Sequence, residues 1–468
     1  MKAKPEKRGY FYRVFRDDEL GLHLTKPQMR RFLLGHILLG PALHFIPFLS
    51  TAYAVMVGLF CLYIAVKFPR PDAVIGAMGY VAGMEVLVRM SRAQVFWMYS
   101  EYLIIFLALT MMLRQKPVRK PLLSALFYMF FLVPSVFVLI LTEQGETARQ
   151  AFAFNLLGPL ALGFAVFAVS RVHLERSIFE DSLFISSLPV FAIMSIISIG
   201  YIQGKVEFMA VSASNKLAAG GFAPNQVANA LSYGTVCFIT LYLLAKKWAA
   251  YRYFYLGSFI VASLLAILTL SRGGIMNLGG FLLVIALFRL VGARHRIRFA
   301  ILLSLMTYMY INVLLPAIDD YSKGAVERRY EDKKTSQRDV LAAQEYQVFL
   351  ESPVLGVGPG GAVKYHQLHM REESVMTHTE YTRLLAEHGS FGILAFVSLL
   401  LMYFKLQWSA KSIADRGWVL GALAWVLIMF SHSATRIVLF AFLSVLMVIL
   451  VYGIEKPEQE KSWKALNE

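Results

Sequence analysis

Long apolar runs, separated by short polar and charged segments, make up most of this sequence. Between residue 32 and residue 454 these runs recur, and each is long enough to cross roughly 30 Å of hydrocarbon as an α-helix. A backbone can cross a bilayer alone only when its hydrogen bonds are satisfied internally, as they are in a helix. The pattern therefore predicts an all-α polytopic membrane protein with about 12–14 transmembrane helices.

Fourteen spans can be placed when every run is counted separately. Pro41 and Pro47 interrupt the first two runs, so the number of spans in 32–67 is left open. The first 31 residues are basic and polar, and no signal peptide is visible there. The predicted spans are about 32–48, 52–67, 72–90, 95–113, 121–142, 150–170, 182–202, 226–245, 253–270, 274–291, 297–316, 388–406, 416–432 and 436–454.

The distribution of basic residues predicts the orientation. With the N-terminus in the cytoplasm, 30 of the 46 Lys and Arg residues fall on the inner side and 16 on the outer side. Nine of those 16 lie in one long loop, 317–387, and long loops follow the positive-inside rule poorly. The short segments therefore divide 30 to 7. We expect both termini to be cytoplasmic and loop 317–387 to be extracytoplasmic.

Composition excludes several classes of protein. Only 16% of the residues are charged, whereas a soluble domain carries about 25%. The net charge of +16 comes from clusters at span ends that face anionic lipid, and no soluble basic face suited to nucleic acid is present. Cys61 and Cys237 lie inside apolar spans, so we expect them to be packing residues without a disulfide framework.

A charged segment, VMTHTEYTRLLAEHG, leads into the twelfth span on the expected outer face. On a helix, His378 shares a face with Tyr381, while Glu380, Arg383 and Glu387 line another face. Arg383 and Glu387 are expected to form a solvated i,i+4 pair. His378 stands at the start of the helix, where an open cavity could reach it.

A second polar feature is the stretch LTLSRGGIMN. It places Arg272 between two apolar spans on the expected outer face, against the positive-inside bias and without a nearby acid. One interpretation is an arginine that reaches the lipid headgroups. The other is an anion site, because Gly273 and Gly274 should leave room for a large anionic group to approach the backbone.

The long loop contains KTSQRDVLAAQEYQVFLESPVLGVGPGG, which predicts an amphipathic helix from near Ser336 to just before Pro353. Arg338 lies in its first turn. Residues 323–338 contain six basic and three acidic residues, so this half of the loop is locally +3. GVGPGG matches the GxGxxG pattern, but no strand–turn–helix unit surrounds it. We expect a turn that positions the neighbouring helices.

Two further groups carry less information. Glu85 and Arg89 are spaced i,i+4 at the outer end of the third span, close to Arg92, and are expected to neutralise each other. His366 and His369 are spaced i,i+3 but lack the further ligands that a metal site needs. The sequence predicts no metal and no other cofactor.

Several of these segments together resemble the superfamily of O-antigen ligases and Wzy-type O-antigen polymerases. These are bacterial membrane glycosyltransferases with the C-type architecture and one long periplasmic loop. The resemblance covers roughly residues 205–405. The matching strings are SRG at 271–273, Arg338 followed by PVLGVG at 353–358, HTEYTRLLAEHG at 378–389, and Pro224-Asn225 in GGFAPNQVANAL.

This resemblance implies a metal-independent enzyme at the periplasmic face of the bacterial inner membrane. It would take a glycan from an undecaprenyl-diphosphate carrier and join it to an acceptor sugar hydroxyl. Arg272 and Arg338 are assigned to the diphosphate and His378 to the acceptor hydroxyl. The residue after the histidine is commonly Asn in the family and is Thr379 here. Supporting roles are assigned to Arg89, Asn225, Glu380 and Tyr381.

The resemblance also implies a domain organisation. A cytoplasmic basic leader, 1–31, precedes a transmembrane glycosyltransferase domain, 32–454, and a cytoplasmic tail, 455–468, follows it.

Elementary chemistry requires the same residue types at the site. Guanidinium groups bind phosphate oxygens bidentately, and one imidazole base is enough for direct, inverting displacement of a diphosphate. His388, one helix face away from His378, is expected to tolerate replacement.

The motifs leave alternatives open. A ligase would pass the glycan to a lipid A-core or similar lipid acceptor, whereas a polymerase would pass it to another lipid-linked glycan. A protein O-glycosyltransferase would need a C-terminal segment that is not recognised here. A transporter or lipid flippase would place charged residues in broken helices near mid-span, often with internal symmetry. In this sequence the ionisable residues gather at outer span ends and in one loop.

Overall fold

Helices account for nearly all of the regular structure. The computed structural model describes residues 21–206, 214–291, 308, 312–313, 315–325, 327–328, 338–370, 379–433 and 435–455. Within these ranges there is no strand, and one isolated bridge joins Glu175 to Ile454. The prediction of an all-α fold is confirmed.

The predicted spans and the observed helices agree closely. The helices of the first half are α2 (Lys26–Phe45), α3 (Pro47–Lys67), α4 (Pro71–Met90), α5 (Tyr99–Arg114), α6 (Leu123–Leu132), α7 (Pro134–Thr142), α8 (Gly145–Ser170) and α9 (Ser177–Ile202). Those of the second half are α10 (Pro224–Leu244), η1 (Ala249–Tyr251), α11 (Arg252–Leu268), α12 (Arg272–Val291), α14 (Leu315–Tyr321), α16 (Arg338–Glu351), α17 (Gly361–Met370), α18 (Glu380–Ser409), α19 (Ile413–Phe430) and α20 (Leu439–Tyr452). Every predicted span coincides with a helix except 297–316, most of which lies outside the described residues, and 121–142, which is divided between α6 and α7.

Length and apolarity make this a multi-pass membrane protein. Among the described residues, nine helical segments are long and apolar enough to cross a bilayer, and two shorter apolar helices, α12 and α20, accompany them. Pro41 lies inside α2 and does not end it, whereas Pro47 begins α3 after a break at Ile46. The first two runs are therefore two separate helices.

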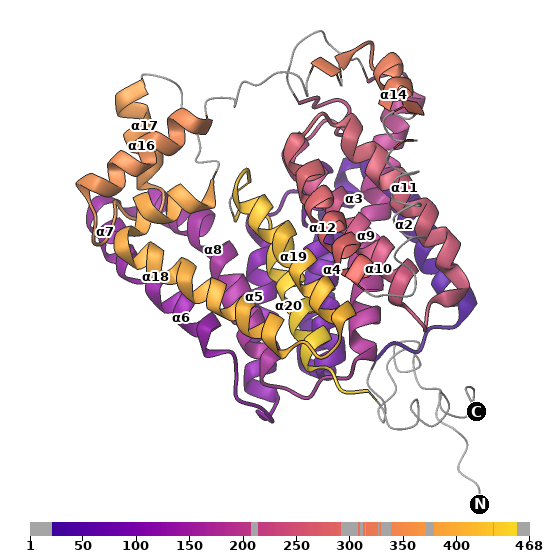
Figure 1. Ribbon diagram of the computed structural model, residues 1–468, viewed down its shortest axis with the longest axis horizontal. Helices are drawn as coiled ribbons and strands as arrows, with labels where there is room; N and C mark the ends of the chain where they lie inside the picture. Colours follow the sequence, from indigo (N-terminus) through magenta and orange to yellow (C-terminus); the bar gives the residue numbers. More distant parts are fainter. Residues whose placement is uncertain are drawn as a thin grey trace, which may run out of the picture.

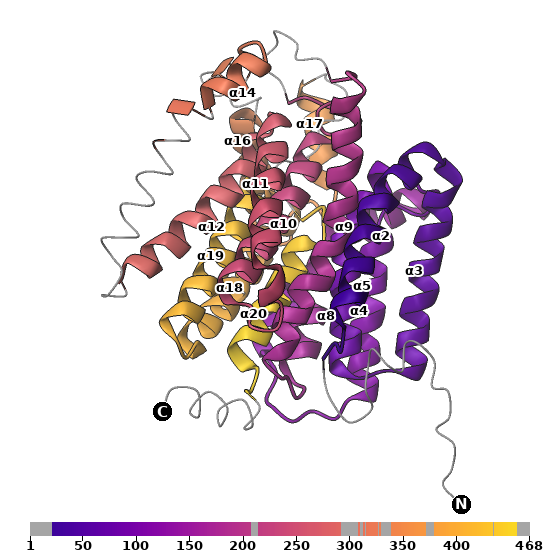
Figure 2. The same ribbon diagram turned by 90° about the vertical axis from the view of Figure 1, so that its right-hand side faces the viewer.

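The helices form a bundle with two distinct ends (Figures 1 and 2). Helices α14, α16 and α17 lie at one end, which we call the loop end. Helices α4 and α19 finish there, and α5, α10, α12, α18 and α20 begin there. The last turn of α4 is thus close in space to segments that are distant in sequence, because Arg89 contacts both Gln226 and Arg436.

Helices α4 and α20 form the centre of the bundle. Every residue from Leu439 to Val451 is buried, and so is nearly all of α4. A helix that is apolar on all sides is stable only when it is surrounded by other helices or lipid. The peripheral helices instead expose large apolar side chains, such as Phe48 and Leu59 on α3. This distribution suits a bundle whose outer surface faces hydrocarbon.

Two helix breaks lie close together near the loop end, one between α6 and α7 and the other inside α18. The GVGPGG turn packs against both breaks. Pro134 separates α6 from α7, and α18 is kinked at Gly389, whose φ of 59° is readily accessible only to glycine. The kink directs two carbonyl groups of α18 out of the helix, where they accept from the turn. Val357 N donates to the Ala386 carbonyl (2.9 Å) and Gly358 N to the Glu387 carbonyl (3.1 Å). The prediction that this segment is a positioning turn is confirmed.

Candidate functional site

The first residues of α18 mark one side of the candidate site. The helix begins at Glu380, and the Thr379 side chain caps it by accepting from Thr382 N (3.3 Å). Thr and Asn are both favoured at this position because either side chain can satisfy a free N–H of the first turn. The capping role explains how Thr379 can stand where Asn is common. His378, the residue before this cap, lies outside the described residues.

Arg383 is the centre of a buried ion network, and the expectation of a solvated pair is wrong. Its side chain is only 2% exposed. The guanidinium binds Glu380 at 2.6 and 2.9 Å and Glu387 at 2.9 Å, and both carboxylates are fully buried. Charges at i, i+3 and i+7 lie along one stripe of a helix, and this stripe faces the protein interior instead of solvent.

Helix α16 packs on this network through Glu345. The Thr382 hydroxyl donates to the Glu345 carboxylate, which is 1% exposed. Burial, reinforced by the nearby Glu387, raises the pKa of Glu345 to about 7 although Arg383 and Arg436 oppose this shift. Arg338, seven residues earlier, lies in the first turn of α16, as predicted; its side chain is not among those that the structure describes. The contact therefore fixes the helix that carries Arg338 against the start of α18.

Arg272 begins α12 on the other side of the candidate site. It is partly buried and follows Ser271, whose hydroxyl donates to Asn225 Oδ1 (2.8 Å) in the first turn of α10. The predicted open surroundings are not found. A Cβ on Gly273 would lie 2.3 Å from the His432 ring, and one on Gly274 would lie 2.5 Å from the Ala228 side chain. These glycines allow close helix packing and do not leave space for a ligand.

The connection between α19 and α20 joins the two sides. At one end of this connection, the His432 ring packs on Gly273, next to Arg272. At the other end, the Thr435 hydroxyl lies 3.3 Å from both Glu380 and Arg383 at the start of α18. His432 and Thr435, three positions apart in one short segment, thus contact the start of α12 and the start of α18, respectively.

Arg436 completes this connection. It is a partly buried cation near Arg383, Glu380, Glu387 and Glu345. Burial and the neighbouring Arg383 lower the pKa of Arg436 to about 10, and the three carboxylates oppose that change. Because this value is still well above neutrality, Arg436 stays charged and adds a second guanidinium to the network.

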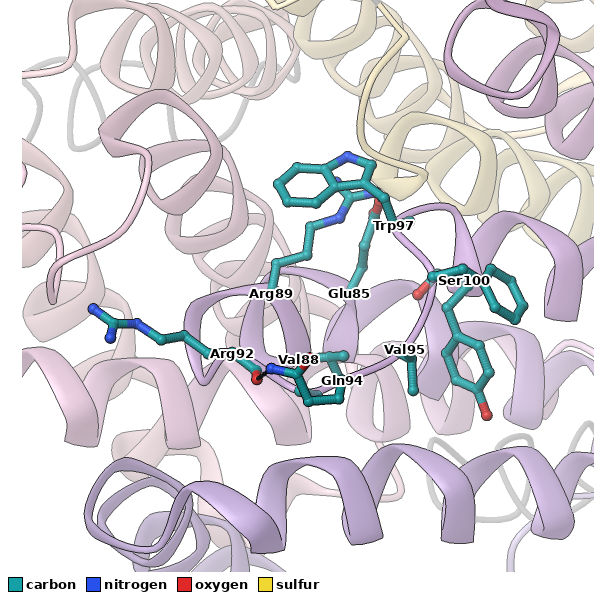
Figure 3. A pocket seen from close by; sticks show the side chains of 11 residues that line it. Glu85, Val88, Arg89, Arg92, Gln94, Val95, Trp97 and Ser100 are labelled. Atoms are coloured by element: carbon teal, nitrogen blue, oxygen red, sulfur yellow. Dashed lines mark hydrogen bonds and ion pairs between the residues drawn. The ribbon is translucent and has the colours of Figure 1, made fainter. Parts of the chain in front are cut away.

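A second buried ion cluster lies beneath the α4–α5 turn (Figure 3). Arg89 pairs with Glu85 at 2.6 Å, as predicted, and with Glu101 at 3.3 Å. The same guanidinium donates to the carbonyls of Trp97 and Arg436, both at 3.0 Å. Arg89 therefore ties α4 and α5 to the α19–α20 connection.

Residues 257–397 match the family model described as O-antigen ligase. The chain carries an O-antigen ligase domain. This domain extends from α11 to the middle of α18 and contains Arg272, Arg338 and His378. Arg89, Asn225 and Arg436 lie outside the matched range. No curated protein matches the sequence.

The family of this domain consists of membrane enzymes of the glycosyl-transfer type, and the described helices make the chain a multi-pass membrane protein. The structure brings the start of α12, the start of α16 and the start of α18 to the same end of the bundle. Asn225 accepts from Ser271 just before α12, Glu380 binds Arg383 within the first turn of α18, and Arg89 binds the α19–α20 connection. Tyr381, half-buried on α18, donates its hydroxyl to the Leu427 carbonyl (2.7 Å) and so links the domain to α19.

His388, also in the O-antigen ligase domain, has a structural role that the sequence analysis did not predict. Its side chain is fully buried, and Nδ1 lies 2.6 Å from the hydroxyl of Ser135, just after the break between α6 and α7. Replacement would remove a contact between two broken helices. The expectation that His388 tolerates replacement is therefore withdrawn on physical grounds.

Sequence reasoning missed Glu101, Glu345, His432 and Arg436. A usable signal existed for Glu101, because an acid inside an otherwise apolar span normally faces the bundle interior. No comparable signal marks Glu345, which looks like any acid of an amphipathic helix. The side chains of His366 and His369 are outside those described, and the described part of the chain contains no cluster of three His, Cys, Asp or Glu residues that could hold a metal ion.

Proposed function

We propose that this protein transfers a glycan from an undecaprenyl-diphosphate carrier to an acceptor sugar hydroxyl at the extracytoplasmic membrane surface. The observation that carries the proposal is the α19–α20 connection. It contacts the residue after Arg272 through His432 and the start of α18, two residues after His378, through Thr435. The start of α12, which carries Arg272, and the start of α18, which follows His378 in the sequence, therefore flank one short segment.

In the proposed mechanism, Arg272 and Arg338 bind the diphosphate of the donor. Negative charge develops on this group as its bond to the sugar carbon breaks, and guanidinium groups stabilise it without a metal ion. His378 accepts the proton of the acceptor hydroxyl, whose oxygen forms the new bond to that carbon from the opposite side. The products are the inverted glycoside, the free polyprenyl diphosphate and a proton on His378.

The deciding experiment measures transfer and donor binding separately with purified protein. His378→Ala should lower the transfer rate by roughly 10²–10⁴-fold and leave donor binding nearly unchanged. Arg272→Ala and Arg338→Ala should weaken donor binding, and Arg→Lys should restore little because the planar fork is lost. Near-normal transfer by well-expressed His378→Ala would remove the general base from the mechanism.

The identity of the acceptor distinguishes a ligase from a polymerase. The assay is therefore run with a lipid A-core acceptor and, separately, with a second lipid-linked glycan. We propose the ligase, so product should form with the lipid A-core acceptor. Product with the lipid-linked acceptor alone would instead identify a polymerase.

The proposed orientation has its own test in intact cells. Cysteine at position 336 should react strongly with an impermeant thiol reagent, and cysteine at position 462 should react weakly. Cys61 and Cys237 are buried, so they add little background. Labelling in the reverse order would place the candidate site in the cytoplasm and exclude the proposed donor chemistry on the outer surface.

A further inference from the structure

A small pocket lies between the end of α4 and the 91–98 turn that leads into α5 (Figure 3). Its volume is about 250 Å³, and Arg89, Gln94 and Trp97 contribute to its wall. Pockets for drug-sized ligands are typically about 300–1,000 Å³. This pocket is therefore suited to one ring-sized group, such as a single residue of a larger molecule.

The charges in the wall disfavour an anion. Arg89 is paired with two carboxylates, Glu85 and Glu101. The Trp97 ring lies over the guanidinium, with its centroid 4.7 Å from Arg89 Cζ. The guanidinium of Arg92, at the rim, extends away from this cluster (Figure 3). A phosphate or carboxylate in the pocket would meet a cation that is already neutralised. A neutral ligand avoids that repulsion.

The polar atoms in the wall are suited to a hydroxyl group. Arg89 Nε is buried, and its N–H has no acceptor within the described part of the chain. A buried donor without an acceptor is costly, so a ligand or water oxygen at this position would be stabilised. The exposed amide of Gln94 at the rim offers both a donor and an acceptor.

The aromatic side chains at the pocket are suited to contact the apolar face of a sugar ring. Trp97 is 43% exposed, and the neighbouring Phe96 is also exposed. Aromatic rings have negative faces that attract the weakly positive C–H bonds of a sugar. A pocket that combines an aromatic surface, a free buried donor and a rim amide is characteristic of neutral carbohydrate recognition.

Arg89 also connects this pocket to the candidate site. Its guanidinium donates to Gln226 Oε1 (3.3 Å), next to Asn225, and Asn225 accepts from Ser271, next to Arg272. We propose that the pocket binds one neutral sugar residue of the glycan that is transferred or extended. This inference rests on the proposed function for the identity of the glycan, but sugar binding can be measured without turnover.

The test uses ¹⁹F NMR of the full chain labelled with 5-fluorotryptophan. Trp97→Phe assigns the Trp97 signal, and Trp408, 78% exposed on α18 near its far end, serves as an internal control. Neutral hexoses, 6-deoxyhexoses and N-acetylhexosamines are titrated one at a time, beside glucuronate and inorganic phosphate. At least one neutral sugar should shift the Trp97 signal saturably and leave Trp408 unmoved. Gln94→Leu should weaken that binding roughly 3- to 10-fold.

Three outcomes would overturn the proposal. The Trp97 signal could fail to respond to every neutral sugar, which would identify a hydrated structural cavity. It could respond to glucuronate or phosphate alone, which would identify an anion site. Trp97 and Trp408 could also shift together, which would show a nonspecific solvent effect.

The failure of the proposed function would look different. Normal transfer by Arg272→Ala and His378→Ala would contradict the transfer mechanism, whereas the NMR titration would still report whether the pocket binds sugar. If both hold, Trp97→Ala should raise KM for the glycan with little change in kcat, because the pocket does not contact the reacting atoms.

Discussion

Arg383→Met tests whether the buried ion network stabilises the fold. All five N–H groups of this guanidinium are used in the native structure. The acceptors are the two carboxylate oxygens of Glu380, Glu387 Oε2, the Asn155 carbonyl and Thr435 Oγ1. Methionine nearly preserves the volume but donates no hydrogen bond. It would leave two buried carboxylates without the cation that balances them.

The expected cost follows from what is left behind. Removing one partner of a buried ion pair costs about 3–5 kcal/mol, because the other partner stays buried without compensation. Arg436 lies close enough to be influenced by both carboxylates, so we expect the lower part of that range, about 3 kcal/mol. In the triple variant Arg383→Met, Glu380→Gln and Glu387→Gln, the stranded charges are absent, and most of the loss should be recovered.

The assay can use the two native cysteines. Cys61 and Cys237 are 1% and 0% exposed, so a dye that becomes fluorescent on reaction with thiols reports unfolding during a thermal ramp in detergent. Arg149→Met is the matched control, because Arg149 pairs with Glu146 at i,i+3 on the surface. Its melting temperature should stay unchanged. Equal melting of Arg383→Met and Arg149→Met would refute the reasoning, as would a triple variant no more stable than the single one.

Three further predictions use the same melting assay. Arg92→Gly should stabilise the protein by about 1 kcal/mol, because Arg92 has a φ of 60° that glycine adopts without strain; a lower melting temperature would contradict this. Burial places the pKa of Glu345 near 7, above its ordinary value of 4.5, so its stabilising contribution is complete below about pH 4.5 and is lost as the pH rises through 7. Glu345→Gln should therefore flatten the decline in melting temperature between roughly pH 5 and pH 8, and an unchanged slope would exclude this carboxyl as its source. His388→Ala should destabilise the protein by about 1–3 kcal/mol through the lost contact with Ser135. A melting curve identical to that of the wild type would show that His388 has no structural role.

The spans could be predicted from sequence because the bilayer imposes one simple requirement. A run of apolar residues must be helical to cross it, whatever the neighbouring helices do. The breaks inside the helices were harder to predict from the sequence. Pro134 divides a predicted span, whereas Pro41 leaves α2 intact, and local sequence does not distinguish the two cases. The kink at Gly389 depends on the 353–358 turn, which supplies hydrogen bonds from outside the helix.

The candidate site could be predicted only in part. Arg272, Arg338 and His378 stand out because motifs surround them. The network of Arg383 and Glu345 was missed because burial depends on which helices pack together. A triad such as Glu380, Arg383 and Glu387 has the same i, i+3, i+7 spacing whether it faces water or another helix. The burial of Glu345 required knowledge that α16 lies against α18.

Two helix ends beside the site contain left-handed residues that are not glycine, and only one of them has a compensating contact. Leu270, at φ 56°, ends α11 two residues before Arg272, and its side chain is buried against Ile267 and Ala325. Burying a leucine contributes about 1.5–3 kcal/mol, which offsets a left-handed backbone cost of about 1–2 kcal/mol. Arg92 ends α4 in a Schellman pattern, where Ala93 N bonds the Val88 carbonyl, but its side chain is exposed. Packing does not offset its backbone strain, so we expect the arginine to act at the loop-end surface, in contact with lipid headgroups or substrate.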